Sequence, residues 1–321
     1  MPRQPRLDIP GLVFHIMGRG IEGRNIFQDD KDREGFLKRL ADEVSKPGGP
    51  HLYAWALLPN HFHLLIRNGE GLLSPMMRRL MTGHAVSYNL RHKRQGHLFQ
   101  NRYKSIVVEE EPYFLELVRY IHLNPVRAGI LQNMEELARY RYTGHSVLVG
   151  QRKFQAQEED AVLGRFADRR NVALNGYLDY LAAGISQGRR EELRGGGLAR
   201  SLGGERLSNS EERELSDERI LGGGHFVEEV LNLDDKGDEE RKASVEDILR
   251  AVAIKSGVNS EQILGTSRNR VISRARRRFY LMASRKVGVT ITMLARLTGR
   301  SHVAVKLAIE QAELEEEEQK I

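Results

Sequence analysis

Apolar and polar residues alternate in two rhythms along the first 130 residues. Four short apolar runs bordered by glycine or proline are typical of strands, and three stretches with apolar residues at helical spacing predict helices. The strands are expected at 11–18, 51–58, 61–67 and 96–109. The helices are expected from Asp30 to the stop at Lys46, over 72–90, and from Pro112 towards Pro125. The order β-α-β-β-α-β-α is the ferredoxin-like arrangement with one added helix, so an α+β domain is expected.

The pattern weakens between residues 151 and 240. Helical spacing returns at 162–166 and 172–185, separated from the C-terminal region by glycine-rich loops and a charged linker. The loops are expected at 194–198 and 201–204, and the linker at 234–242. We therefore expect a first domain over 1–150, an accessory helical segment and linker over 151–240, and another domain over 241–321.

Residues 241–321 have a helical pattern throughout, so an all-α region is expected. Helices are expected after the capping residues Ser244 and Ser260, over 268–286, over 290–297 and over 301–313, followed by a frayed acidic end. The Thr298-Gly299 turn separates two short helices, and the second has a polar start. This arrangement is typical of a helix-turn-helix that binds DNA.

Composition narrows the possible chemistry. The chain has 321 residues, of which 40% are hydrophobic and 29% charged, so it can bury a core. It has no cysteine, which excludes a disulfide framework, a thiol nucleophile, a cysteine-ligated zinc and an iron–sulfur cluster. No apolar run approaches the ~20 residues of a membrane helix, and the first ten residues lack the apolar core of a signal peptide. We expect a soluble, cytoplasmic protein with no membrane partner.

Charge is distributed unevenly along the chain. Residues 1–130 hold 19 basic and 13 acidic side chains, and residues 131–240 hold 15 and 22. Residues 241–310 hold 15 basic and 4 acidic side chains. Two basic regions around an acidic middle suggest two modules that bind polyanions, and ordinary solvated surfaces are the alternative.

Two histidines on the third expected strand are candidate metal ligands. Residues i and i+2 of a strand point to the same face, so His61 and His63 present their imidazoles side by side. Two neighbouring imidazoles form half of a divalent-metal site. Most His-x-His pairs bind no metal, so the pair alone leaves ordinary surface or core histidines as the alternative.

Tyr120 and Asn124 lie four residues apart on the helix after the fourth expected strand, so they share a face of that helix. The amide of an asparagine can offer a metal a neutral oxygen, and a tyrosine can act as an oxygen nucleophile. A residue before proline avoids the helical conformation, so the helix can also end at Asn124. A packing role is the alternative for Tyr120.

Three ordered blocks resemble the signature blocks of the single-tyrosine HUH transposases, with the REP-associated tyrosine transposases as the nearest group. The blocks are Leu58-Pro-Asn-His-Phe-His-Leu-Leu65, Gly96-His-Leu-Phe-Gln-Asn-Arg-Tyr-Lys104 and Tyr120-Ile-His-Leu-Asn-Pro-Val-Arg-Ala-Gly129. The resemblance covers residues 8–150 and implies a HUH nuclease fold that acts on single-stranded, hairpin-containing DNA. It implies that His61 and His63 are metal ligands and that Asn124 is the third, amide ligand. It leaves the oligomeric state open, because family members act as monomers or dimers.

The same resemblance implies a covalent mechanism. Tyr120 would attack phosphorus and form a 5′-phosphotyrosine, which leaves a free 3′-OH and conserves the bond energy for rejoining. A phosphate substrate and an oxygen ligand favour Mg²⁺ or Mn²⁺, while two imidazoles also accept Zn²⁺. Basic and aromatic residues on the fourth expected strand suit single-stranded DNA. These DNA-contacting residues are expected to be Arg102, Tyr103 and Lys104.

Residues 260–310 resemble the C-terminal DNA-binding domain of the DnaA replication initiator. The resemblance rests on Ile263-Leu-Gly, the arginine-rich stretch 268–278 and Gly299-Arg-Ser-His-Val-Ala-Val305, which departs from the family's recognition block at three positions. It implies binding to duplex DNA. Phosphate contacts are expected from Arg268, Arg270, Arg274, Arg276, Arg277 and Arg278, and base contacts from Arg300, Ser301 and His302.

These observations predict a single-stranded DNA endonuclease and strand transferase of the transposase type. A DNA-binding regulator with an inactive nuclease domain is one alternative, although such a domain usually loses part of the His-x-His, tyrosine and asparagine set. A rolling-circle replication initiator or relaxase is another, but the chain has no Gly-x-x-x-x-Gly-Lys-Ser/Thr motif and no paired second tyrosine. A zinc hydrolase is the most distant alternative, because no His-Glu-x-x-His pattern is present.

Overall fold

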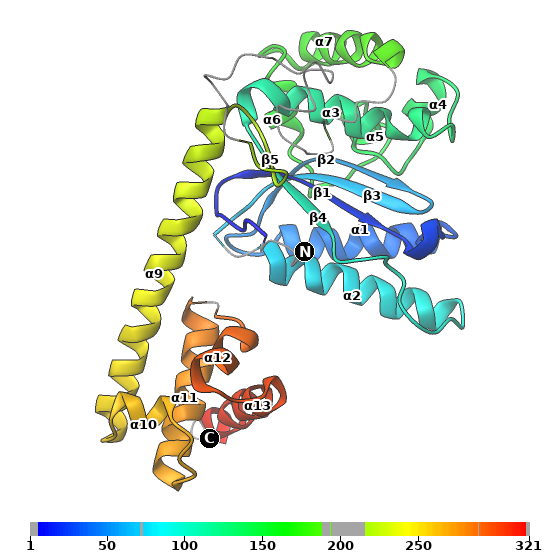
Figure 1. The fold of residues 1–321 in the computed structure, drawn as a ribbon. Helices are drawn as coiled ribbons and strands as arrows, with labels where there is room; N and C mark the ends of the chain where they lie inside the picture. Colours follow the sequence, from blue (N-terminus) through cyan, green and yellow to red (C-terminus); the bar gives the residue numbers. More distant parts are fainter. Residues whose placement is uncertain (1–5, 71–72, 188–192, 194–215, 288, 319–321) are drawn as a thin grey trace, which may run out of the picture. The chain divides into compact units, whose positions relative to one another are not determined.

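The computed structural model describes the chain except residues 1–5, 71–72, 188–192, 194–215, 288 and 319–321 (Figure 1). Nor are the side chains of residues 235–243, 286 and 316–318 described. The glycine-rich loops expected at 194–198 and 201–204 lie outside the described residues. The chain divides into two compact units, Met1–Leu231 and Asn232–Ile321, and each is considered by itself.

The first unit is built on a mixed five-stranded sheet with the order β2-β3-β1-β4-β5. Its strands are β1 (Val13–Arg19), β2 (His51–Leu58), β3 (His61–Arg67), β4 (Lys104–Val108) and β5 (Ile220–Leu221). Neighbouring strands are antiparallel except β4 and β5, which are parallel. The first helices are α1 (Asp30–Val44), α2 (Leu73–Arg91) and α3 (Glu110–Arg127). The predicted order β-α-β-β-α-β-α is therefore confirmed.

The edge of the sheet differs from the prediction in two ways. β4 begins only at Lys104, and not at Gly96, where the backbone turns with φ 85°. Phe99 forms only an isolated bridge with Gly20. The sequence pattern does not predict β5, since a two-residue strand has no periodicity to recognise.

Each face of the sheet has its own hydrophobic core. Helices α1 and α2 cover one face (Figure 1), where Phe14, Phe36 and Phe62 are fully buried. Helix α3 covers the other face, where Ile106 and Ile121 are fully buried. Further helices of this unit are α4 (Met134–Arg139), α5 (Gly144–Leu148), α6 (Glu159–Leu163) and α7 (Arg170–Ala183).

Helix α3 continues through Pro125, which the sequence marked as a possible end. The N–H groups of Ile130 and Leu131 both donate to the Pro125 carbonyl at the C-terminal end, and the helix stops at Arg127. Since Asn124 is helical, it lies one turn after Tyr120 on the same face of α3.

The charged segment expected as a linker is helical. It belongs to α9, which spans Gly224–Ser256. The helices that lie wholly in the second unit are α10 (Ser260–Leu264), α11 (Arg270–Val287), α12 (Ile291–Thr298) and α13 (His302–Glu318). Asn259, and not Ser260 as expected, caps α10 in a capping box with Gln262. None of the helices described is long and apolar enough to cross a membrane.

Helices α12 and α13 are joined by a glycine turn, as the sequence predicts. Gly299 ends α12 in the left-handed conformation with φ 61°, which glycine adopts without steric cost. The Ser301 hydroxyl oxygen accepts from the Ala304 N–H at 3.2 Å and caps α13. Buried Phe279, Leu294 and Val305 pack the helices of this unit into one core. The helix of α13 continues to Glu318, where a frayed end was expected.

Candidate active site

A cleft of about 510 Å³ lies where β1 ends, β3 and β4 begin, and α3 passes the sheet. It is lined by Met17, Gly18, Arg19, Asn60, His61, His63, Gln100, Asn101, Arg102, Lys104, Tyr120, Asn124, Arg127 and Ala128. The structure thus brings together the two histidines, the tyrosine and the asparagine predicted from four separate positions. Arginine, lysine and amide side chains surround them, so the cleft is polar and positively charged.

The strand register sets the positions of the two histidines. His61 pairs with Arg19 and His63 with Met17 across β1, so both imidazoles lie on the sheet face that α3 covers. Their ring centroids are 5.1 Å apart. His63 is buried and His61 is half-buried, so the pair lies between the core and the open cleft.

Helix α3 brings Tyr120 and Asn124 to the histidines. The Tyr120 ring lies edge-on to His63, with 5.7 Å between the ring centroids. The Arg127 guanidinium carbon lies 5.5 Å from the centroid of the same tyrosine. Tyr120 and Asn124 are both buried apart from their access to the cleft. The phenol ring of Tyr120 therefore lies among imidazoles and a cation.

The donor set fits a divalent cation. The Nδ1 atom of His61 lies 2.7 Å from Asn60 Oδ1, and the Nδ1 atom of His63 lies 2.9 Å from His15 Nε2. Both rings thus use Nδ1 in a hydrogen bond, so Nε2 is the atom that each ring could offer to a cation. Within the described part of the chain, the buried amide nitrogen of Asn124 has no hydrogen-bond partner. Two imidazoles and an amide group so placed could hold such an ion.

Several residues around these candidate ligands were not predicted from the sequence. His15 on β1 and Asn60 in the β2–β3 turn contact the histidines directly. Arg127 approaches the tyrosine, and its guanidinium also donates to the Gly184 carbonyl at 3.1 Å. His15 could have been found from the sequence, because it lies on a strand at an alternation that points to the site face. Arg127 could have been found as the residue seven positions after Tyr120 on the same helix.

The three expected contacts for single-stranded DNA have different environments. Arg102 and Lys104 line the cleft. Tyr103 does not: it is 7% exposed and belongs to the core of the opposite face. The Arg6 guanidinium lies 4.1 Å from its ring centroid, and its hydroxyl lies 3.0 Å from Ser74 Oγ. The expectation of base stacking on Tyr103 is therefore corrected, because neighbouring side chains alternate between faces.

The arginines expected to contact duplex DNA also differ among themselves. Arg276 is 4% exposed and donates to the carbonyls of Gln262, Ile263, Gly265 and Ser267, so it holds the α10 region in place and is not available to phosphate. Burial lowers its pKa. Arg277 pairs with Glu315 at 2.5 Å, and Arg274, which is 62% exposed, lies 3.5 Å from the same carboxylate. At the start of α13, Ser301 and His302 are exposed and Arg300 is half-buried.

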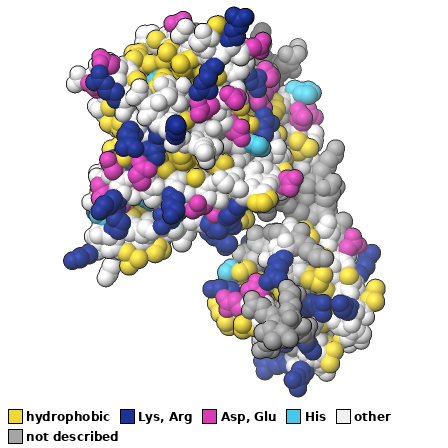
Figure 2. Space-filling model, turned by 180° about the vertical axis from the view of Figure 1, so that it is seen from behind, with side chains coloured by type: hydrophobic (Ala, Val, Ile, Leu, Met, Phe, Trp, Pro, Cys, Tyr) yellow, Lys and Arg dark blue, Asp and Glu magenta, His cyan; other side chains and the backbone are white. Residues whose placement is uncertain are grey.

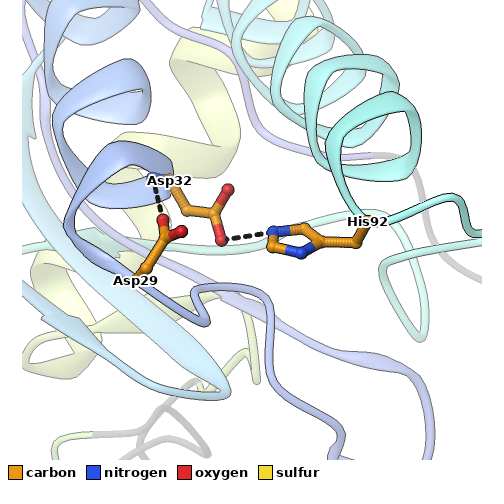
Figure 3. Close-up of side chains that lie close together, drawn as sticks. All are labelled: Asp29, Asp32 and His92. Carbon is orange, nitrogen blue, oxygen red and sulfur yellow. Dashed lines mark hydrogen bonds and ion pairs between the residues drawn. The ribbon is translucent and has the colours of Figure 1, made fainter.

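A second group of possible metal ligands lies between the start of α1 and the end of α2 (Figure 3). Asp29, Asp32 and His92 offer ligand atoms within 4.8 Å of one another. Both carboxylates already bind Arg91, and His92 Nε2 lies 2.9 Å from Asp32. The hydrogen bond from Arg91 lowers the pKa of Asp29 to about 2. The arginine supplies the positive charge that an ion would bring, so this cluster acts as an ionic connection between two helices.

A comparison with models of protein families agrees with the family expected from the motifs. Residues 9–124 match the family model of IS200-like transposases, which confirms the family resemblance over that part of the chain and supports a transposase-type function. A search of curated proteins finds no match. A solved structure of a REP-associated tyrosine transposase bound to a REP hairpin is 16% identical, with a TM-score of 0.39, over 49% of this chain and 98% of its own. The C-terminal resemblance to DnaA stays a prediction.

Proposed function

We propose, from the premise that residues 9–124 match the IS200-like transposases, that the cleft cleaves and rejoins single-stranded DNA through a tyrosine. The observation that carries this proposal is the position of Tyr120, which lies edge-on to His63 in a cleft that also contains His61 and Asn124. A regulator with an inactive nuclease domain would not need these four side chains in one cleft.

The reaction exchanges one phosphate ester for another. The Tyr120 oxygen attacks phosphorus and forms a 5′-phosphotyrosine, while the bond between phosphorus and the 3′-oxygen breaks. The phenol loses one proton and the departing 3′-oxygen gains one, so the reverse attack by a 3′-OH restores the tyrosine and joins two strands. A divalent cation held by His61, His63 and Asn124, with Mg²⁺ or Mn²⁺ as the expected ions, would supply positive charge beside the phosphate oxygens.

Other residues of the cleft support this chemistry electrostatically. Arg127, whose guanidinium carbon lies 5.5 Å from the Tyr120 ring centroid, brings a positive charge beside the proposed nucleophile and can attract a DNA phosphate. Arg102 and Lys104 at the cleft can follow the backbone of a single strand. Tyr103, which is buried on the other face, has no part in this proposal.

The second unit would bind duplex DNA. Figure 2 shows Lys and Arg side chains on its surface. Arg270, Arg274 and Arg278 lie at four-residue spacing on α11 and line a cleft of about 500 Å³ together with Lys255. In this proposal α12 and α13 form a helix-turn-helix. Arg300, Ser301 and His302, at the start of its second helix, would meet the bases, and Arg270, Arg274 and Arg278 would meet phosphates.

A covalent-trapping experiment tests the nuclease part. The full chain is incubated with labelled hairpin-bearing single strands and Mg²⁺, and adducts are resolved on denaturing gels. We expect a labelled protein band with the wild type and with Tyr113→Phe, a matched change on the same helix, and none with Tyr120→Phe. An adduct that persists in Tyr120→Phe would contradict the proposal.

A further inference from the structure

A buried histidine on β1 lies directly behind the metal-ligand pair. His15 faces Leu65 in the β1–β3 register and is fully buried on the face that α3 covers. Its ring stacks on His63, with 5.2 Å between centroids. His15 Nε2 lies 2.9 Å from His63 Nδ1, and His15 Nδ1 lies 3.2 Å from the Leu193 carbonyl oxygen. Both nitrogens of His15 are therefore used within the protein.

The chemistry of these partners determines which nitrogens carry protons. A carbonyl oxygen only accepts, so His15 Nδ1 must hold a hydrogen and donate to Leu193. In a neutral His15 ring, Nε2 is then an acceptor, and His63 Nδ1 must donate to it. The lone pair of His63 is consequently on Nε2, the atom that a metal ligand needs.

Asn60 determines in the same way which nitrogen of His61 carries the proton. Its amide nitrogen donates to the Gly23 carbonyl at 3.1 Å, which orients its Oδ1 towards His61. That oxygen lies 2.7 Å from His61 Nδ1, so this nitrogen must be the donor. Two unrelated acceptors thus impose one tautomer on both ligand histidines.

We propose that His15 and Asn60 are positioning residues that fix His63 and His61 with the proton on Nδ1 and Nε2 ready to bind a cation. The proposal rests on the proposed function, since it assigns these histidines to a metal. Neither positioning residue has to touch DNA. The two roles differ in strength because His63 is buried, so water cannot replace His15, whereas half-exposed His61 can donate to water when Asn60 is removed.

Metal affinity of the full chain tests the proposal without any cleavage assay. Mn²⁺ binding is measured by electron paramagnetic resonance for the wild type, His15→Leu, His15→Gln and Asn60→Ala. We expect His15→Leu to weaken binding by roughly 10–100-fold. His15→Gln should lose less, because a glutamine oxygen can still accept from His63, and Asn60→Ala should lose less than His15→Leu. His84→Leu is the matched control, since His84 is buried and bonded to the Ile26 carbonyl but lies in the other core, and should bind Mn²⁺ as the wild type does.

Nitrogen NMR of histidine-labelled, metal-free protein gives a second readout, which needs no folded His15→Leu variant. We expect the wild-type spectrum to show His63 and His61 as Nδ1–H tautomers. A wild-type His63 that carries its proton on Nε2, or a folded His15→Leu protein with wild-type Mn²⁺ affinity, would overturn the proposal. A failure of Tyr120 as the nucleophile would leave both readouts unchanged, so the two ideas fail separately.

Discussion

Helix α3 contributes to two sites that each contain two histidines and a tyrosine, and they have different chemistry. In the cleft, Tyr120 lies beside His61 and His63. On another face of the same helix, His122 Nδ1 lies 2.9 Å from the hydroxyl of Tyr177, and His145 Nδ1 lies 2.7 Å from the same oxygen. His122, His145 and Tyr177 form an inner cluster, in which all three residues are fully buried. Burial raises the pKa of Tyr177 and lowers the pKa of both histidines.

The two sites differ in access and in charge. The inner cluster shares one hydroxyl between two neutral rings, and a Cβ on Gly144 would approach His122 Nε2 to 2.7 Å. It therefore leaves no space for a substrate beside His122. The cleft instead opens to arginine and lysine side chains. Access and positive charge separate a candidate catalytic tyrosine from a structural one.

The largest effect should come from exchanging one hydroxyl at each site. Tyr120→Phe should reduce cleavage to background, since it removes the proposed nucleophile but leaves the ring in place. Tyr177→Phe should keep cleavage close to wild type and lower the free energy of unfolding by about 1–3 kcal/mol, because two buried histidines lose their hydrogen-bond partner. Gel-based cleavage and urea unfolding measure the two effects. A comparable loss of cleavage in folded Tyr177→Phe would contradict the assignment of a structural role to Tyr177.

Metal removal should act on the cleft alone. Excess chelator should stop cleavage, and Mg²⁺ or Mn²⁺ should restore it. The urea concentration at which the first unit unfolds should change little. His63→Ala should impair cleavage more than Asn124→Ala, because an imidazole is the stronger ligand. Cleavage at full rate in excess chelator would contradict the proposed role of a metal ion.

Acid should affect the inner cluster through the pKa of its histidines. Burial lowers the pKa of His145 to about 4, below the ~6.5 of an unfolded histidine. The unfolded chain therefore binds more protons between these values, so stability is present above pH 6.5 and is lost as pH falls towards 4. The loss at pH 5 should be about 2 kcal/mol for this residue. The free energy of unfolding, measured in urea at pH 7 and pH 5, should fall less in His145→Gln than in the wild type. In His51→Gln, a change at an exposed histidine, it should fall as much as in the wild type.

The smallest effect should appear in the salt dependence of duplex binding by the second unit. Arg274→Ala and Arg278→Ala should each reduce the slope of log affinity against log salt by about one, because each lost phosphate contact releases roughly one counterion fewer. Arg276→Ala should mainly destabilise the fold, since its guanidinium holds four carbonyls. Anisotropy titrations at several salt concentrations measure the slopes. Unchanged slopes for Arg274→Ala and Arg278→Ala would mean that these arginines do not contact the duplex.

Local periodicity was enough to predict the parts of the molecule that depend on short-range spacing. The His-x-His alternation on β3 and the four-residue spacing of Tyr120 and Asn124 on α3 were visible in the sequence, and the structure brings these residues into one cleft. Facing partners were not visible, because His15 meets His63 only through the β1–β3 register. The burial of Tyr103 and Arg276 likewise depends on tertiary packing, which a count of basic and aromatic residues does not contain.

Mass spectrometry of the trapped adduct can identify the residue that attacks the DNA. The wild-type chain is reacted with a hairpin-bearing single strand, digested with nuclease and protease, and searched for peptides that carry a residual nucleotide. We expect a 5′-phosphate linked to the side chain of Tyr120. A nucleotide on Tyr113, on Tyr177 or on any other residue, with Tyr120 unmodified, would contradict it.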